Sequence, residues 1–222
     1  VNTFELKNQL ANQNVDDAVY QYQHARSPKE LLFQFTRCMV HFAVDDAQVK
    51  FCTRLQGKES WFLPFNKGYK DGAGNPPNPD GLMTDYLWKQ VLTKDMLSRI
   101  IENYATLVEE KDEETGKTRY KQIFPRYHQL TAVESLLADV KKNGVGNRYL
   151  IQHSAGSGKS NSIAWLAHQL TGLEDAQGNL LVDSVIVVTD RVVLDKQIRD
   201  TIRQFAQTRN IIAVSYTHLR DH

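Results

Sequence analysis

Apolar and polar residues alternate with different periods in the two halves of the chain. In the first half, the run NTFELKN at residues 2–8 has a period of two, which is typical of a β-strand. The run VDDAVYQYQHA at residues 15–25 has helical spacing, and CMVHFAV and VKFCTRL are strand candidates on either side of a predicted hairpin turn at residues 45–47. The first half, to about residue 88, is therefore predicted to be α+β.

A long segment rich in glycine, proline, asparagine and aspartate follows at residues 64–81. Such a loop inside a compact domain is uncommon and often functional, although a solvated connector is the simpler interpretation. A helical pattern then covers residues 84–104, and the charged run at residues 109–121 predicts a solvated hairpin or a linker. We place the domain boundary near residue 100, which gives domains at residues 1–100 and 101–222.

The second half has the pattern of a parallel α/β sheet. Apolar residues recur at helical spacing over residues 130–140, and Gly144 and Gly146 are expected to end this helix. The apolar runs RYLIQ and SVIVVTD predict two buried strands, each followed by a helix, the first ending at Leu170 and the second covering residues 192–205. IIAVSY predicts the start of a third strand. Helices and strands in this order predict a parallel sheet covered on both faces.

The composition excludes some classes of protein. The chain of 222 residues is 41% hydrophobic and 24% charged, within the globular range. Its 27 Lys and Arg residues almost balance 26 acidic residues, so DNA binding must come from local patches rather than from a basic field over the whole chain. No apolar run is long enough to span a membrane, and Cys38 and Cys52 are expected to be small core residues rather than a disulfide framework. We therefore expect a reducing, cytoplasmic compartment.

The run HSAGSGKS at residues 153–160 has most of the pattern of a phosphate-binding loop. Gly158, Lys159 and Ser160 are present, but His153 stands where the leading glycine is usual. Backbone N–H groups of such a loop point at the anion where a helix begins, so the residues of closest approach must be small. The small residues here are Ala155, Gly156, Ser157 and Gly158. We expect Lys159 to reach the β- and γ-phosphates of ATP and Ser160 to hold Mg²⁺.

The position of His153 only closes the turn, so histidine is compatible with phosphate binding and is more naturally a structural residue than a base. Two flanking features narrow the class. Upstream, FPRYHQL places Gln129 before the nucleotide-binding strand, and an amide can pair bidentately with the adenine edge. Downstream, Thr189, Asp190 and Arg191 end an apolar run in a way that resembles the motif by which superfamily 2 helicases bind a DNA phosphate backbone.

Over nearly its whole length, to about residue 214, the chain resembles the restriction (R) subunit of type I restriction–modification enzymes. The resemblance is carried by LPFNKG, GAGNP, FPRYHQL, LIQHSAGSGKSNSIAWLAHQL and VIVVTDRVVLDKQI. In that family histidine stands at the leading glycine position, so the loop is expected to be intact. The resemblance implies the C-terminal part of a PD-(D/E)xK-type α+β nuclease domain, followed by the N-terminal part of a RecA-like parallel-sheet P-loop helicase lobe. It also implies ATP and Mg²⁺, double-stranded DNA, and methyltransferase and specificity subunits as partners.

The resemblance also assigns nuclease residues. A PD-(D/E)xK nuclease uses two carboxylates and a lysine around a divalent metal, and FELK offers Glu5 as a ligand of the nuclease Mg²⁺ and Lys7 to polarise water or phosphate. Residues two apart on a strand face the same side, so Glu5 and Lys7 are expected to face one metal while Phe4 and Leu6 pack behind. Gln21 resembles a glutamine that some of these nucleases place beside the site, whereas the tyrosine sometimes found four residues later is Ala25 here.

The same family pattern indicates parts that are expected outside the sequence. The metal-binding Asp of the nuclease is expected before Val1, and the acidic motif and second lobe needed for ATP hydrolysis are expected after His222. The fragment alone is therefore expected to be inactive. The last residues, 215–222, fit the family poorly and suggest non-native sequence.

Other functions remain open at this stage. A superfamily 2 translocase of repair or remodelling type, without a nuclease role, fits the same second half. A regulatory module that binds a nucleotide without hydrolysing it is another alternative. A small-molecule kinase is disfavoured because no acceptor site is recognisable. The DNA sequence recognised cannot be inferred, because in the R-subunit family a separate subunit reads it.

Overall fold

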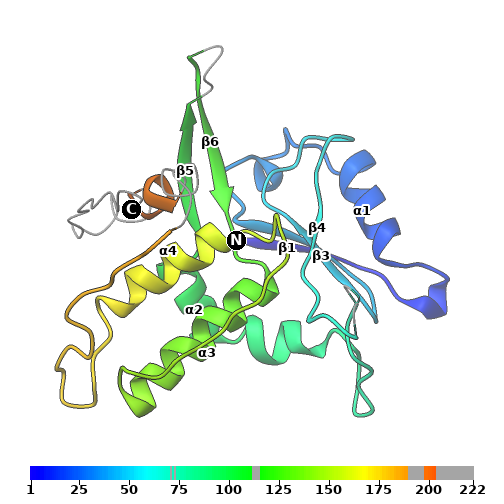
Figure 1. The fold of residues 1–222 in the computed structure, drawn as a ribbon. Coiled ribbons are helices and arrows are strands. Elements are labelled where there is room, and N and C mark those ends of the chain that lie inside the picture. Colours follow the sequence, from blue (N-terminus) through cyan, green and yellow to red (C-terminus); the bar gives the residue numbers. More distant parts are fainter. Residues whose placement is uncertain (71, 73, 112–115, 190–197, 204–222) are drawn as a thin grey trace. The chain divides into compact units, whose positions relative to one another are not determined.

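The computed structural model describes residues 1–70, 72, 74–111, 116–189 and 198–203 (Figure 1). The chain divides into two compact units, Val1–Thr131 and Ala132–His222, called here the N-terminal unit and the C-terminal unit. The predicted domain boundary near residue 100 lies inside the N-terminal unit and stays a prediction. Among the described residues, no helix has the length and apolar character needed to cross a membrane.

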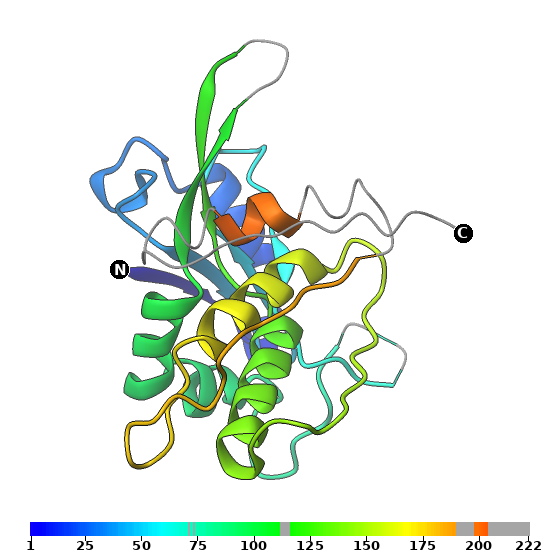
Figure 2. The same ribbon diagram turned by 60° about the vertical axis from the view of Figure 1, so that its left-hand side comes forward.

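Most elements predicted for the first half are confirmed. The N-terminal unit contains, in order, β1 (Asn2–Leu6), η1 (Gln9–Ala11), α1 (Val15–His24), η2 (Leu31–Phe33), β2 (Val40–Val44), β3 (Val49–Cys52), β4 (Leu63–Pro64), η3 (Leu87–Val91), α2 (Lys94–Asn103), β5 (Thr106–Lys111) and β6 (Thr118–Ile123). The helical pattern at residues 84–104 is divided between η3, a π-helix, and α2, because Thr93 leaves the helical region and its side chain accepts the Met96 N–H. The charged run forms the predicted hairpin, with β5 and β6 paired antiparallel (Figure 2).

Strands β1 to β4 form one sheet with α1 on one face. The strand order is β1-β2-β3-β4; β1 is parallel to β2, and the other two pairs are antiparallel. Helix α1 makes the crossover between the parallel strands and packs against β1, β2 and β3 (Figure 1). A capping box begins this helix, because Asn14 accepts the Asp17 N–H while the Asp17 carboxylate accepts the Asn14 N–H.

Strand β2 is the centre of the core, and all five of its residues are buried. On one face, Phe42 stacks on Phe4 of β1 with ring centroids 5.4 Å apart and meets Phe51, Phe65 and Phe124 edge-on or tilted. On the other face, Ala43 belongs to a cluster with Val15, Ala18 and Tyr22 of α1. Cys38 and Cys52 are buried free thiols, as predicted, and burial raises the pKa of Cys52 to about 11.

Asp45 connects the start of α1 to the β2–β3 turn. This carboxylate is 5% exposed; its Oδ2 accepts the Val15 N–H at 2.8 Å, and its Oδ1 accepts the N–H groups of Ala47 and Gln48 at 2.8 and 2.6 Å. Its backbone carbonyl accepts the hydroxyl of buried Thr84 at 2.9 Å. One side chain therefore joins the predicted hairpin turn to the helix that covers the sheet.

The second half departs from the predicted parallel sheet. Helix α3 (Tyr127–Asn143) buries Leu130, Val133, Leu137 and Val140 and is followed by Gly144 at φ +75°, as expected. Helix α4 (Lys159–Leu170) also lies where it was predicted. Of the predicted helix at residues 192–205, only residues 198–203 are described, and they are helical.

The two predicted buried strands of the second half are wrong for this structure. Residues 148–152 and 184–189 are coil (Figure 2), and Leu150, Ile186 and Val188 are 93%, 84% and 82% exposed. A strand is held by the hydrogen-bond ladder of its neighbour, and within the described residues neither run has a strand partner. The predicted third strand at residues 211–216 lies outside the described residues.

Candidate functional site

Three polar side chains follow one another on the α1 face of β1. Thr3, Glu5 and Lys7 are two residues apart, so they project to the same side of the sheet. Phe4 projects to the opposite side and packs against Phe42 and Trp88. The expectation that Leu6 packs behind the site is wrong, because Leu6 is 60% exposed at the last position of the strand.

The structure brings together Lys7 and Gln21, two of the predicted nuclease residues. Lys7 Nζ donates to Gln21 Oε1 at 2.6 Å, from the end of β1 to α1. Glu5 has a different partner: its Oε1 accepts the Nε–H of Arg26 at 2.5 Å. The Glu5 side chain is 12% exposed and that of Arg26 is 36% exposed, so the ion pair is partly shielded from water. This hydrogen bond to Glu5 raises the pKa of Arg26.

Arg26 is the residue that sequence reasoning missed. It lies just after α1 and follows Ala25, the C-cap of the helix, which holds the position where the resemblance would place a tyrosine. Ala25 is exposed and supplies no functional group. The only available signal was the position of Arg26 four residues after the buried Tyr22, and such spacing is too common to single out a residue.

The residues described here do not by themselves complete the expected divalent-metal site at Glu5, and its metal role stays a prediction. The described part of the chain has no group of three His, Cys, Asp or Glu side chains that could hold a metal ion. Glu5 also lies between two cations, Arg26 through an ion pair and Lys7 two residues along the strand. One carboxylate beside two positive charges is a poor divalent-metal site and a better environment for an anion.

A buried hydrogen-bonded network lies beside this polar row. The Thr3 hydroxyl is 2.9 Å from the Tyr22 hydroxyl and 2.7 Å from His41 Nδ1. His41 is 1% exposed, and burial lowers its pKa from 6.5 to about 4; burial also raises the pKa of Tyr22. The network joins β1, α1 and β2, and burial keeps His41 neutral at pH 7.

We expect the stability of the N-terminal unit to fall as the pH drops from 6.5 to 4. In this window the unfolded chain protonates His41 while the folded protein keeps it neutral, so protons favour unfolding, by about 3 kcal/mol at pH 4. Urea unfolding at pH 7 and pH 4 measures the loss in the wild type and in His41→Gln, which cannot titrate. Because other groups titrate in both proteins, the wild type must lose about 3 kcal/mol more than the variant. Equal losses of stability in the wild type and in His41→Gln would contradict the lowered pKa of His41.

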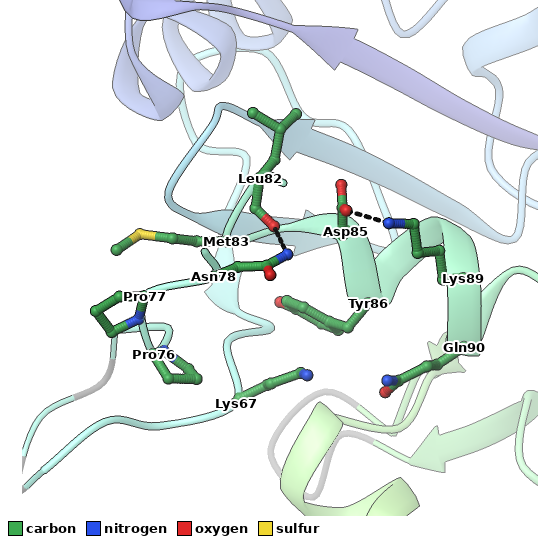
Figure 3. Close-up of a pocket in the computed structure, with 10 residues that line it drawn as sticks. All are labelled: Lys67, Pro76, Pro77, Asn78, Leu82, Met83, Asp85, Tyr86, Lys89 and Gln90. Atoms are coloured by element: carbon green, nitrogen blue, oxygen red, sulfur yellow. Dashed lines mark hydrogen bonds and ion pairs between the residues drawn. The ribbon is translucent and has the colours of Figure 1, made fainter. Parts of the chain in front are cut away.

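The long loop at residues 64–81 forms one wall of a pocket (Figure 3). The pocket has a volume of about 320 Å³ and is lined by Lys67, Pro76, Pro77, Asn78, Leu82, Met83, Asp85, Tyr86, Lys89 and Gln90. Lys67 Nζ lies 5.0 Å from the centre of the Tyr86 ring, and Lys89 is ion-paired with Asp85. Buried Asn75 accepts the Lys67 N–H at 2.8 Å, which anchors the loop. A functional role for the loop stays a prediction.

In the C-terminal unit, residues 153–160 form a turn that leads directly into α4. Gly156 and Gly158 have φ values of +71° and +81°, in the left-handed region that favours glycine. His153 is not among the described residues with positive φ, so its position does not require glycine. Its carbonyl oxygen accepts Lys159 Nζ at 3.2 Å, and the Ser154 carbonyl accepts the same group at 2.8 Å. Any residue supplies a carbonyl, which explains why histidine is compatible with this loop.

The start of α4 fits the phosphate groups of ATP. Gly158 is the N-cap and provides no side-chain hydrogen bond to the first turn, so the N–H groups there can serve an anion. Ala155, Gly156 and Lys159 are exposed, and Ser157 is buried. Ser160 is the second residue of α4 and half-buried, and it carries the hydroxyl expected to hold the Mg²⁺ of MgATP. The roles of these residues stay predictions.

The remaining predicted contacts are placed only in part. Gln129 is 3% exposed and its Oε1 accepts the N–H of Arg126 at 2.9 Å, which caps the start of α3. An adenine contact through this oxygen must compete with the cap. Of the predicted DNA contacts, Thr189 is half-buried in coil, and Asp190 and Arg191 lie outside the described residues.

Comparison with known proteins assigns the second half of the chain. Residues 128–222 match the family described as SWI2/SNF2 ATPase, and this span contains the loop at residues 153–160. No curated protein and no solved structure matches the chain. The matched family consists of ATPases, which agrees with the uncapped, glycine-containing turn before α4. Residues 128–222 are therefore a SWI2/SNF2 ATPase region, a fragment of an ATP-binding superfamily 2 helicase/translocase.

Proposed function

We propose that the chain is part of the restriction (R) subunit of a type I restriction–modification enzyme. In this proposal the SWI2/SNF2 region uses ATP to translocate double-stranded DNA, and the N-terminal unit cleaves the DNA away from the recognition site. Methyltransferase and specificity subunits are the proposed partners, and the specificity subunit reads the DNA sequence. The proposal goes beyond the ATPase match, which covers only residues 128–222.

The observation that carries the nuclease part is the bond between Lys7 and Gln21. The resemblance implies that Gln21 lies beside the site, and Lys7 Nζ lies 2.6 Å from Gln21 Oε1. The amide oxygen orients the ammonium group, which can then polarise a phosphate or an attacking water. Glu5 lies on the same face of β1. A β-α-β unit with this polar face supports a site for phosphodiester chemistry.

In the motor part, the residues of the loop have separate tasks. The N–H groups at the start of α4 and the Lys159 ammonium group bind the phosphates, and the Ser160 hydroxyl binds the accompanying Mg²⁺. Gln129 is proposed to contact adenine after its amide leaves the cap of α3. These residues account for binding and orientation of ATP. Hydrolysis also requires groups that orient water and stabilise the transition state.

The two activities are expected to separate by mutation. In the protein that contains this sequence, assembled with its partner subunits, Glu5→Gln and Lys7→Met should reduce DNA cleavage at least about 1,000-fold because the proposed cleavage needs both the Glu5 carboxylate and the Lys7 ammonium group. DNA-stimulated ATP hydrolysis should stay near the wild-type rate, since Lys159 and Ser160 lie in the other unit. Agarose-gel cleavage of an unmodified plasmid and phosphate release measure the two reactions. Lys58→Met changes an exposed lysine of the same unit and serves as the control.

A second candidate is a translocase of repair or remodelling type without a nuclease role. The pairing of Glu5 with Arg26 favours it, because this pair neutralises the carboxylate that a nuclease needs. The same experiment decides between them. If the assembled wild-type protein hydrolyses ATP on DNA but leaves the plasmid intact, the nuclease assignment is wrong and the second candidate stands.

A further inference from the structure

Two cations and one carboxylate gather at the end of β1, and the mechanism proposed above uses only Lys7 and Glu5. Arg26 contacts this group through its Nε, which donates to Glu5 Oε1 at 2.5 Å. A guanidinium group has five N–H donors, and the structure gives Arg26 no other hydrogen bond among the described residues. Its side chain is 36% exposed, so the remaining N–H groups are accessible.

Lys7 places a second positive charge beside Arg26. Glu5 and Lys7 are two positions apart on one face of an extended chain, so their Cα atoms are roughly 7 Å apart. The Lys7 ammonium group donates to the neutral Gln21 amide and, among the described residues, makes no ion pair with a carboxylate. Glu30 is the other carboxylate that acts on Arg26, but it is exposed, and its Oε1 accepts the Ser27 N–H. The group therefore contains two cationic side chains, Arg26 and Lys7, and one paired carboxylate, Glu5, so its net charge is positive.

We propose that Arg26 and Lys7 bind the phosphate backbone of DNA without a divalent cation, and that Glu5 competes with the phosphate for Arg26. The proposal rests on the proposed function in one respect, that DNA is the ligand. A guanidinium group binds a phosphate through two parallel N–H···O bonds, and one such pair of donors includes the Nε–H that Glu5 accepts. The poor fit of this face to a divalent metal agrees with an anion as its first ligand.

In this competition the Glu5 carboxylate opposes DNA binding, whereas a residue that only stabilised the site would favour it. When DNA binds, its phosphate takes over the guanidinium group and the Glu5 carboxylate loses its partner. Removing the negative charge of Glu5 should therefore strengthen DNA binding, because Arg26 is released and a like charge near the phosphate is lost. If the ion pair only stabilised the turn after α1, its removal would weaken binding or leave it unchanged.

The test is duplex binding by the 222-residue chain in EDTA, measured by fluorescence anisotropy of a labelled short DNA at several salt concentrations. Arg26→Gln should weaken binding about three- to tenfold and lower the slope of log K against log salt by about 1, as expected for one lost phosphate contact. Glu5→Gln should strengthen binding about threefold. In Glu5→Gln/Arg26→Gln this gain should be smaller, because there is no guanidinium group to release.

Arg37→Gln is the matched control, since Arg37 is an exposed arginine of the same unit outside this group. Thermal unfolding of each variant identifies a folding defect. If Arg26→Gln has such a defect, the salt slope is compared between the wild type and Lys7→Gln instead. An unchanged salt slope in both Arg26→Gln and Lys7→Gln, or weaker binding by Glu5→Gln, would overturn the proposal. The assay contains no divalent cation and measures no cleavage, so failure of the nuclease assignment leaves its outcome unaffected.

Discussion

Replacing Lys159 by Ala is expected to weaken MgATP binding about 100-fold, because the ammonium group is the charge that faces the β- and γ-phosphates. In the structure Lys159 Nζ is held by the carbonyl oxygens of His153 and Ser154 at 3.2 and 2.8 Å. The side chain therefore already lies across the loop, and little rearrangement is needed when the phosphates replace these carbonyls. Alanine keeps the helix but removes the charge. Isothermal titration of the chain with MgATP measures the loss.

Lys141→Ala is the control for this experiment. Lys141 is an exposed lysine in the last turn of α3, in the same unit, and carries the same charge. Its removal should change MgATP affinity less than about twofold, because exposed charges are screened by salt and solvent. Equal affinity of the Lys159→Ala protein and the wild type would show that the loop does not hold the phosphates.

Asp45→Ala is expected to destabilise the N-terminal unit by at least about 3 kcal/mol. The substitution removes one buried carboxylate and leaves three N–H groups, those of Val15, Ala47 and Gln48, without their acceptor. Each hydrogen bond to a charged group contributes about 1.5–3 kcal/mol, and the three are not additive because they share one side chain. Urea unfolding followed by circular dichroism measures the change.

The neighbouring aspartate provides a matched control. Asp46 lies in the same turn but is only half-buried, and its Oδ2 accepts a single long bond from the Gln9 N–H at 3.4 Å. Asp46→Ala should therefore cost less than about 1 kcal/mol. Similar losses in both variants would mean that Asp45 contributes only turn propensity and not the connection between α1 and the hairpin.

The phosphate loop shows how much of a site can be predicted from sequence. Glycine at positions 156 and 158 is needed because both residues have positive φ, and the spacing of the motif contained that information. The backbone at His153 does not require glycine, because His153 is not among the described residues with positive φ and its carbonyl accepts Lys159 Nζ. The φ angles of such a turn depend on the residues of the turn itself, so a short motif was sufficient to predict where glycine is needed.

Contacts between residues distant in the sequence were harder to predict from the sequence. The family resemblance predicted only that Gln21 lies beside the site, and not its bond to Lys7. The ion pair of Glu5 with Arg26 was missed, because it depends on how the turn after α1 returns to β1. The runs at residues 148–152 and 184–189 were wrongly predicted as strands from their apolar composition alone. Composition makes a strand favourable, but only a neighbouring strand supplies its hydrogen bonds. Likewise, the cap made by Gln129 competes with the nucleotide contact predicted for it.

The most direct test of the central claim, that residues 153–160 bind the phosphates of ATP, is an amide NMR titration of the chain with MgATP. We predict saturable downfield shifts of the Gly156, Gly158, Lys159 and Ser160 amide protons, because these N–H groups donate to phosphate oxygens at the start of α4. Lys159→Ala should require about 100-fold more MgATP for the same shifts. Saturable shifts elsewhere in the chain, with the amides of residues 156–160 unchanged, would contradict the claim.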